Sequence, residues 1–407
     1  MDSREQRGIV LAATKKIKQG KSGWLVPSQT GDGTHYTVDP QSQSCTCPDH
    51  ELRRVKCKHI FAVEYTVQRE IDADGNITTT KTVRLTYSQN WTAYNAAQIE
   101  EKPRFMALLS DLCRTVPQPV QTFGRPRLLL ADMVFASVFK VYTGFSSRRF
   151  SGDMQEASQQ GLVYKAPHFN SVSNYLADPQ LTPVLKSLVT LSSLPLKSVE
   201  TDFAVDSSGF STSRFVRWFN KKYVRELDNQ EWVKVHLMTG VRTHIVTSVE
   251  ISGWAANDTT FFKPLVQTTA NQFVIREVSA DKAYTSHSNL DLVNQHGATA
   301  FIPFKSNTAF PTDDSTWSKM YHFYMFNREN FLQHYHKRSN VETVFSMVKG
   351  KFGDSVRSKS DEGMINEVLA KVLCHNLCVL IQSIHELGVS PSFPVLNDDA
   401  RLVTLTT

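Results

Sequence analysis

In the second half of the chain, short runs of β-branched and aromatic residues alternate with longer amphipathic stretches. The short runs predict strands at residues 200–207, 232–239, 243–251, 274–279 and 299–304. The longer stretches have helical spacing and predict helices at residues 258–269, 286–295, 332–351 and 362–387. Three strands followed by alternating helices and strands indicate an α/β fold with a mixed sheet flanked by helices.

The first half of the chain has a different pattern. Two strand-like runs, 21–26 and 35–38, precede a group of cysteines, and residues 109–194 are mostly helical in pattern. We therefore expect five parts: a small module at 1–70, a linker at 71–108, a helical region at 109–197, an α/β domain at 198–389 and a tail at 390–407.

Composition and charge narrow the class of protein. The 407 residues are 41% hydrophobic, which is enough to bury more than one core and excludes a disordered chain. The net charge of +6 is modest, but basic residues cluster beside the motifs described below, which suits a polyanionic partner. The N-terminus is polar and the apolar stretch 368–384 contains polar side chains, so we expect a soluble, intracellular protein without a membrane span.

A compact cysteine and histidine pattern lies near the N-terminus. Cys45 and Cys47 are followed, after nine residues, by Cys57 and His59. Three thiolates and one imidazole complete the tetrahedral shell of a structural Zn²⁺ site, which has no open position for catalysis. Because three of the six cysteines fall within this short segment, a metal site is favoured over a disulfide framework. We predict one bound zinc ion.

This arrangement resembles the SWIM zinc finger, which implies a small ββα module. Arg53 and Arg54 lie between the ligands, so a fold held by zinc would display them on its surface. DNA contact is one use of such a surface, and contact with another protein is the alternative.

Two aspartates follow apolar strands of the predicted sheet. Asp206 comes before a Ser-Ser-Gly turn signal in the segment TDFAVDSSGF, and Asp281 ends a strand in VSADKAY. A single aspartate after a strand is most often a turn former. Two neighbouring strands that both end in a carboxylate can, however, present oxygen ligands to one hard divalent cation such as Mg²⁺ or Mn²⁺.

A third carboxylate lies in the helical stretch YHKRSNVETVFSMVKGKF. Tyr335, Arg338, Glu342 and Lys349 fall within a narrow arc of one helical face, because their offsets fit about 100° per residue. Such an arc is, by itself, usually a solvated face. An apolar stripe beside it would dock the helix on the sheet, so that Glu342 faces the two aspartates and the basic residues face bound phosphates.

The helix reproduces the YREK signature of bacterial insertion-sequence transposases of the DDE type, and the segment ADKAY resembles their second-aspartate motif. The resemblance covers residues 199–387 and implies a ribonuclease-H-like catalytic domain. It also implies that Asp206, Asp281 and Glu342 hold two Mg²⁺ or Mn²⁺ ions. The same resemblance implies that three residues of the helix bind phosphates near the transposon end: Tyr335, Arg338 and Lys349.

Two features of the sequence depart from the family pattern. The turn after Asp206 is longer than usual, so Asp202 is an alternative ligand. Residues 305–331 leave little room for the large β-rich insertion of some members.

The helical middle of the chain has basic helix starts, with Arg125 and Arg127 before one apolar helix and further polar starts near residues 146 and 168. Short helices of this kind suit a helix-turn-helix that reads terminal inverted repeats. A helical spacer packed on the catalytic domain is the alternative.

Together these observations predict a transposase that cleaves and joins double-stranded DNA at transposon ends and at the target. Synapsis of two ends implies a homodimer, and the predicted location is the prokaryotic cytoplasm, in association with the nucleoid. Two alternatives stay open: a host-adopted DNA-binding regulator, and a ribonuclease-H-like nuclease without strand transfer.

Overall fold

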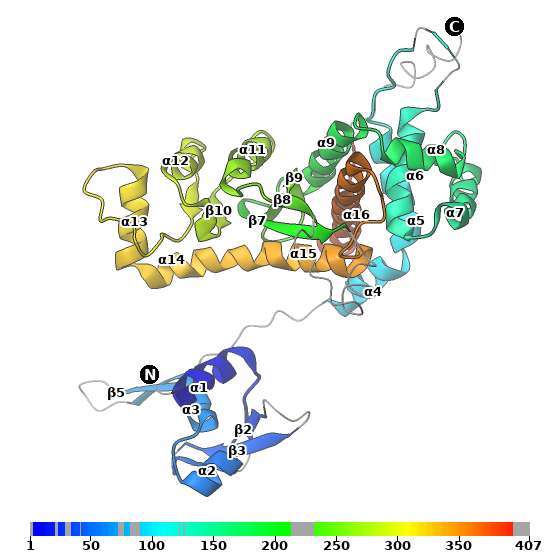
Figure 1. The fold of residues 1–407 in the computed structure, drawn as a ribbon. Helices are drawn as coiled ribbons and strands as arrows, with labels where there is room; N and C mark the ends of the chain where they lie inside the picture. Colours follow the sequence, from blue (N-terminus) through cyan, green and yellow to red (C-terminus); the bar gives the residue numbers. More distant parts are fainter. Residues whose placement is uncertain are drawn as a thin grey trace, which may run out of the picture. The chain divides into compact units, whose positions relative to one another are not determined.

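The computed structural model describes residues 3–20, 23–28, 34–40, 42–71, 77–81, 90–121, 123–124, 127–212 and 232–393. The chain forms two compact units, Met1–Gln89 and Asn90–Thr407 (Figure 1). Each unit has a hydrophobic core of its own. Arg125 and residues 394–407 of the predicted tail lie outside the described residues.

The first unit is built on a small antiparallel sheet with the strand order β1-β2-β3-β4. Its strands are β1 (Lys18–Gly20), β2 (Gly23–Pro27), β3 (His35–Asp39) and β4 (Ser44–Cys45). Its helices are α1 (Ser3–Thr14), α2 (Pro48–Arg53) and α3 (Lys58–Thr66), and the hairpin strands β5 (Val67–Ile71) and β6 (Ile77–Lys81) follow. Helices α1 and α3 pack closely, because a Cβ on Gly8 would lie only 2.5 Å from the Phe61 Cβ. The predicted ββα module is therefore extended by an N-terminal helix.

The second unit contains a mixed five-stranded sheet, as predicted, and its strand order is β11-β10-β7-β8-β9. Strands β7 (Asp202–Ser211), β8 (Trp232–Gly240) and β9 (Val246–Gly253) pair antiparallel, and β10 (Glu277–Ala280) and β11 (Thr299–Phe301) continue the sheet in parallel. Alternate residues of β7 face opposite sides. Phe203 and Val205 enter one core, whereas Ala204 enters the other.

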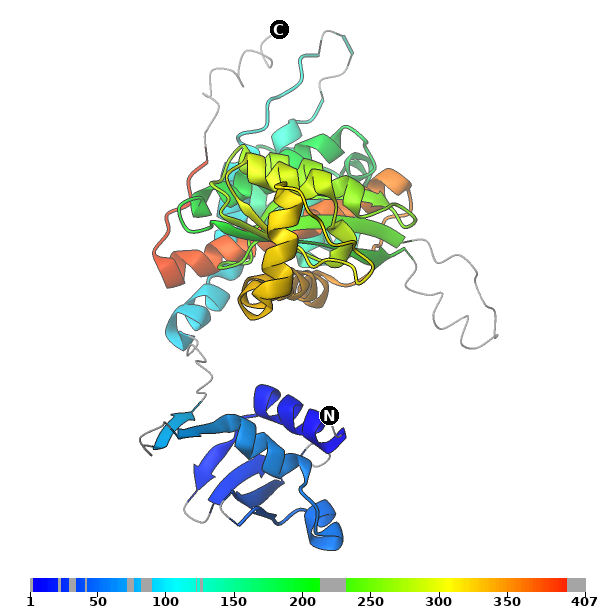
Figure 2. The ribbon, with the colours of Figure 1, turned by 90° about the vertical axis from the view of Figure 1, so that its left-hand side faces the viewer.

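Helices cover both faces of this sheet (Figure 2). One face packs on α11 (Thr259–Ala270), and α12 (His287–Gln295) lies on the same side of the fold. The other face packs on α9 (Leu181–Ser193), α15 (Ser339–Phe352) and α16 (Asp361–Leu387). Between residues 305 and 331 the chain forms a helix, α13 (Thr316–Phe326), and no β-strand is assigned there, in agreement with the prediction that this segment holds no large β-rich insertion.

Helix α16 is the central helix of the larger core. It is long and apolar enough, by length and composition, to cross a membrane, but 83% of its most apolar window is buried inside the protein. Its Asn376 side chain accepts a hydrogen bond from Val246 N at 2.9 Å and donates one to Val246 O at 2.7 Å. Val246 begins β9, the edge strand of the sheet, so this buried amide ties the helix to the sheet edge.

The helical region belongs to the same compact unit as the sheet. Helices α6 (Leu130–Thr143), α7 (Ser147–Gln159) and α8 (Phe169–Leu176) share the core that contains α16. Residues that we predicted as the second half of a linker form α4 (Trp91–Ile99) and α5 (Glu101–Cys113), and Ala97 and Phe105 are buried in that core. The linker predicted at 71–108 is therefore too long, because apolar residues of α4 and α5 pack on α16.

Candidate active site and metal centre

Asp206 and Asp281 lie at the same level of two neighbouring parallel strands. Val205 pairs with Ala280, and each of these residues is followed directly by one of the aspartates. We predicted that Asp206 ends its strand, and this is wrong: β7 continues to Ser211, because β8 pairs with it from Phe203 to Ser211. What ends at Asp206 is the pairing with β10, so the carboxylate lies beside an open strand edge.

The Asp206 carboxylate is 20% exposed and has two close partners. It accepts a hydrogen bond from Ser207 N at 2.8 Å, and Arg338 Nη1 lies 2.7 Å from its second oxygen. Burial nevertheless raises the pKa of Asp206, and the nearby negative charges of Asp281 and Glu342 raise it further. The three predicted carboxylates therefore act on one another electrostatically.

Glu342 lies in the first turn of α15 and is 54% exposed. Arg338 Nη2 is 2.5 Å from its carboxylate, so one guanidinium bridges Asp206 and Glu342. The continuous helix that we predicted over 332–351 is interrupted: α14 (Arg328–Tyr335) is followed by the 3₁₀ turn η3 (His336–Arg338) and then by α15. The apolar stripe is confirmed, since Val341, Phe345 and Val348 are buried.

The donor set fits a hard divalent cation. Asp206 of β7 and Asp281 at the end of β10 follow paired residues, and Glu342 of α15 shares Arg338 with Asp206. Asp281 also caps the turn η2 (Lys282–Tyr284) by accepting from Lys282 N at 2.7 Å. Carboxylate oxygens are the ligands that Mg²⁺ and Mn²⁺ prefer. A nearby cation would also offset the burial that chiefly raises the pKa of Asp206 and the smaller repulsion from Asp281 and Glu342.

The other two predicted signature residues take different positions. Lys349 Nζ donates to Ser208 Oγ at 2.6 Å and lies 5.3 Å from the centre of the Phe210 ring. Burial lowers the pKa of Lys349. Tyr335 is half-buried at the end of α14, with its ring 5.7 Å from that of His336. Lys349 therefore reaches the same strand as Asp206, two residues farther along.

Asp202, the alternative ligand, is held in a separate cluster. Lys337 Nζ lies 2.7 Å from Asp202 and 2.6 Å from Glu277, which is the β10 residue paired with Asp202. His334 Nδ1 lies 2.9 Å from the same glutamate. This cluster fixes the start of β7 and β10 against η3, directly before Arg338.

Sequence reasoning missed a second polar network behind Asp206. The Ser207 hydroxyl donates to Asp258 at 3.1 Å, and Lys234 Nζ lies 2.5 Å from the same carboxylate. Burial raises the pKa of Tyr284 in the ADKAY segment, and the charges of Asp258 and Asp206 add to this. Only Tyr284 stood in a recognised motif, and no pattern connects Lys234, Ser207 and Asp258 along the chain.

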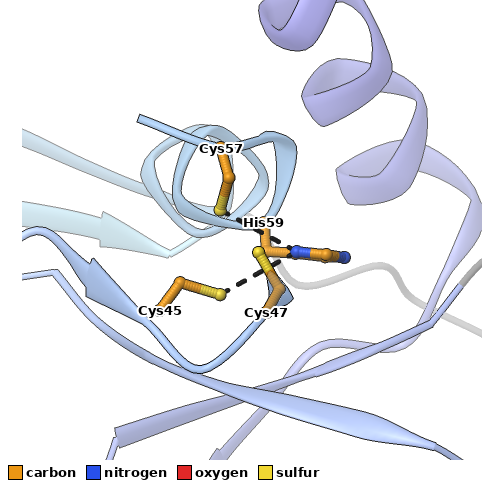
Figure 3. Close-up of side chains that lie close together, drawn as sticks. All are labelled: Cys45, Cys47, Cys57 and His59. Carbon is orange, nitrogen blue, oxygen red and sulfur yellow. Dashed lines mark hydrogen bonds between the residues drawn. The ribbon is translucent and has the colours of Figure 1, made fainter. Parts of the chain in front are cut away.

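In the first unit, Cys45, Cys47, Cys57 and His59 point toward one another (Figure 3). All four are buried, and their ligand atoms lie within 4.8 Å of one another. His59 Nδ1 is 3.8 Å from both Cys45 Sγ and Cys57 Sγ. A hydrogen bond from Cys45 lowers the pKa of Cys57, so one thiolate is favoured at neutral pH. Soft sulfur and nitrogen donors in a closed shell fit Zn²⁺.

The basic residues predicted to contact DNA differ in their surroundings. The Arg53 side chain is 68% exposed and lies 3.4 Å from Asp49, and Arg54 ends α2 in a left-handed conformation with φ of 54°. Arg127 is exposed, and its backbone N–H donates to Gln121. Arg53 and Arg54 belong to the first unit, whereas Arg127 belongs to the second.

Two known protein families match parts of the chain. Residues 197–377 match the transposase DDE domain family, and residues 36–68 match the SWIM zinc finger family. The first matched range contains Asp206, Asp281 and Glu342, and the second contains the cysteine and histidine cluster. The chain therefore combines an N-terminal SWIM zinc finger with the DDE domain of a transposase, and this domain makes it a metal-dependent enzyme that cuts and transesterifies phosphodiester bonds.

Proposed function

We propose that the protein binds the terminal inverted repeats of its own element and moves it by cut-and-paste transposition. The observation that carries this proposal is the placement of Asp206 and Asp281 directly after paired residues of two parallel strands, with Arg338 joining Asp206 to Glu342. A regulator that only binds DNA has no need of three crowded carboxylates. A homodimer that pairs two ends, in the cytoplasm and on the nucleoid, belongs to the same proposal.

In this proposal the three carboxylates hold two Mg²⁺ or Mn²⁺ ions. When bound, such ions activate a water molecule or the 3′-hydroxyl and stabilise the leaving oxygen. The chain's own basic groups position the DNA: Arg338 and Lys349 neutralise phosphates, and Tyr335 contacts the backbone beside them. Because Arg338 bridges Asp206 and Glu342, it lies within reach of any phosphate held there.

The same proposal assigns a structural Zn²⁺ to Cys45, Cys47, Cys57 and His59. The four buried donor atoms support it. A closed shell of this kind stabilises a fold and supplies no catalytic step. Arg53, on the exposed side of this module, then serves as an additional phosphate contact.

The decisive experiment follows cleavage and joining of DNA that carries the two ends of the element, in Mg²⁺. Wild type is compared with Glu342→Gln, and Glu329→Gln, an exposed glutamate of α14, serves as the matched control. We expect Glu342→Gln to lower both reactions by about a thousandfold or more while end binding survives, because a carboxylate oxygen of the metal shell is lost. The control should keep wild-type rates.

Other outcomes contradict the proposal in distinct ways. Equal activity of wild type and Glu342→Gln removes Glu342 from the site. Cleavage without joining of paired ends favours a nuclease, and binding without cleavage in both proteins favours a regulator.

A further inference from the structure

Helix α8 presents a polar face that the fold does not use. Val172 and Leu176 are buried on one side of this eight-residue helix. Asn170, Ser173 and Asn174 are exposed on the other side. Their offsets of three and four residues place the three polar side chains on one face. This face contains neither the charged residues of an ordinary solvated helix nor apolar residues that would dock another protein.

The side chains of this face are suited to reading base edges. Among the described residues, neither the Asn170 nor the Asn174 side-chain amide makes a hydrogen bond. Each amide offers a donor and an acceptor side by side, which matches N6 and N7 of adenine in the major groove. The Ser173 hydroxyl adds one group that both donates and accepts, and its bond to Phe169 O is long, at 3.4 Å.

Two neighbouring helices hold α8 in a defined position. Gly144, with φ of 65°, ends α6 and lets α7 begin at Ser147, and the buried Phe150 and Met154 of α7 join the core shared with α8. Such a group of three helices supports one helix whose outer face is free. In Figure 1, α7 and α8 lie at the end of the second unit opposite α13, with α16 between them and β10.

Positive charge borders the polar face. Arg148 is exposed, and its guanidinium lies 5.8 Å from the centre of the Phe169 ring at the start of α8. Lys165 is exposed and lines a cavity of about 620 Å³ between α7 and α8. The Asp153 carboxylate of α7 is neutralised by α5, because Lys102 Nζ of that helix lies 3.1 Å away. A polyanion can therefore approach α8 without meeting an uncompensated carboxylate of α7 at that position.

We propose that α8 is the recognition helix of the protein, entering the major groove of double-stranded DNA at the end of the element. Asn170, Ser173 and Asn174 read the bases, and Arg148 and Lys165 contact the flanking phosphates. This inference rests on the proposed function, because it names the surface by which a transposase would select its ends.

The test selects binding sites for the full-length protein from a pool of random 30-base-pair duplexes, without added Mg²⁺. We expect wild type to enrich one sequence motif. The double variant Asn170→Ala and Asn174→Ala should still bind DNA but lose discrimination at one or two positions of the motif, by roughly fivefold to a hundredfold at each. Asn294→Ala, an exposed amide of α12, is the matched control and should keep the wild-type motif.

A second variant separates phosphate contact from base reading. Arg148→Ala should weaken binding to all sequences alike and lower the slope of log K against log salt by about one, without changing the motif. Single variants Asn170→Ser and Asn174→Ser are used if the double variant does not fold.

A wild-type motif in the α8 double variant, or in both single variants where these replace it, overturns the proposal. So does a motif that changes with Arg53→Ala and Arg54→Ala but not with the α8 variants, since recognition then lies in the zinc module. In either case the dependence of cleavage on Glu342 is measured separately, so the proposed function stands or fails by its own experiment.

Discussion

The two clusters of metal-binding type are assembled in opposite ways. The four donors of the zinc module lie between residues 45 and 59, are all buried and surround one point. The three carboxylates come from residues 206, 281 and 342, and Glu342 is more than half exposed. In the proposed function, the first arrangement closes a shell around an ion that stabilises the fold, and the second leaves an open side at which a substrate phosphate can enter.

This difference indicates which of the two units depends on a metal ion for its folding. Among the side chains that the structure describes in the first unit, few apolar ones are buried, and three of these are the zinc-type cysteines themselves. The second unit has two extended cores on the two faces of its sheet. We expect the first unit to need its ion for folding and the second to need its ions only for chemistry.

Loss of zinc should have the largest effect. Cys57→Ser is expected to abolish zinc binding and to unfold residues 1–89, because structural zinc contributes on the order of 10 kcal/mol to small modules. The transition of the second unit should be unchanged. Zinc content and calorimetry of the full chain check this, with Cys378→Ser in α16 as a control that keeps zinc. If Cys57→Ser keeps its zinc, or if the unfolding transition of the first unit is unchanged, the expected difference between the two units is contradicted.

A smaller effect is expected from Lys337→Met. The substitution leaves the part-buried carboxylates of Asp202 and Glu277 without their shared cation, which costs about 1–3 kcal/mol. Because η3 would no longer be fixed before Arg338, the cleavage rate should fall by roughly tenfold to a hundredfold. Lys337→Arg should restore most of the rate. Lost stability with an unchanged rate would limit Lys337 to a structural role.

The smallest effect concerns the pH dependence of stability. The pKa of Asp206 is raised in the folded protein, so ionisation of this group destabilises the fold as pH rises from the ordinary pKa of aspartate through the raised value. In the absence of divalent metal, Asp206→Asn should therefore unfold about 1–3 °C above wild type at neutral pH. This difference in unfolding temperature should become smaller as the pH is lowered toward the ordinary pKa of aspartate. If the unfolding temperature of Asp206→Asn rises further above that of wild type as the pH falls, the folded protein stabilises the ionised carboxylate instead.

The same comparison explains what could be predicted from the sequence. The zinc-type ligands are close neighbours along the chain, so their spacing alone indicates a shared centre. The carboxylates are far apart, and only their motifs connected them before the sheet register of β7 and β10 was known. Both groups of residues lie inside the ranges that match the two families.

The errors have long-range causes. The Ser-Ser-Gly segment after Asp206 has turn composition, but pairing with β8 keeps it extended, and Gly209 lies against the Trp232 ring. The predicted helix is interrupted at His336, and the next residue, Lys337, forms ion pairs with carboxylates of β7 and β10. Helical periodicity carries no information about either contact. The helices α4 and α5 were missed for the same reason, because their partner α16 follows more than 240 residues later.

The Asn376 amide has a consequence for solubility. Strand β9 is an edge strand, and edge strands offer unpaired N–H and C=O groups to strands of other molecules. Asn376 satisfies both backbone groups of Val246, as a neighbouring strand would, from a helix that cannot extend the ladder. One buried side chain thus caps the start of the edge, and Asn376→Leu should favour edge-to-edge association of protein molecules on heating.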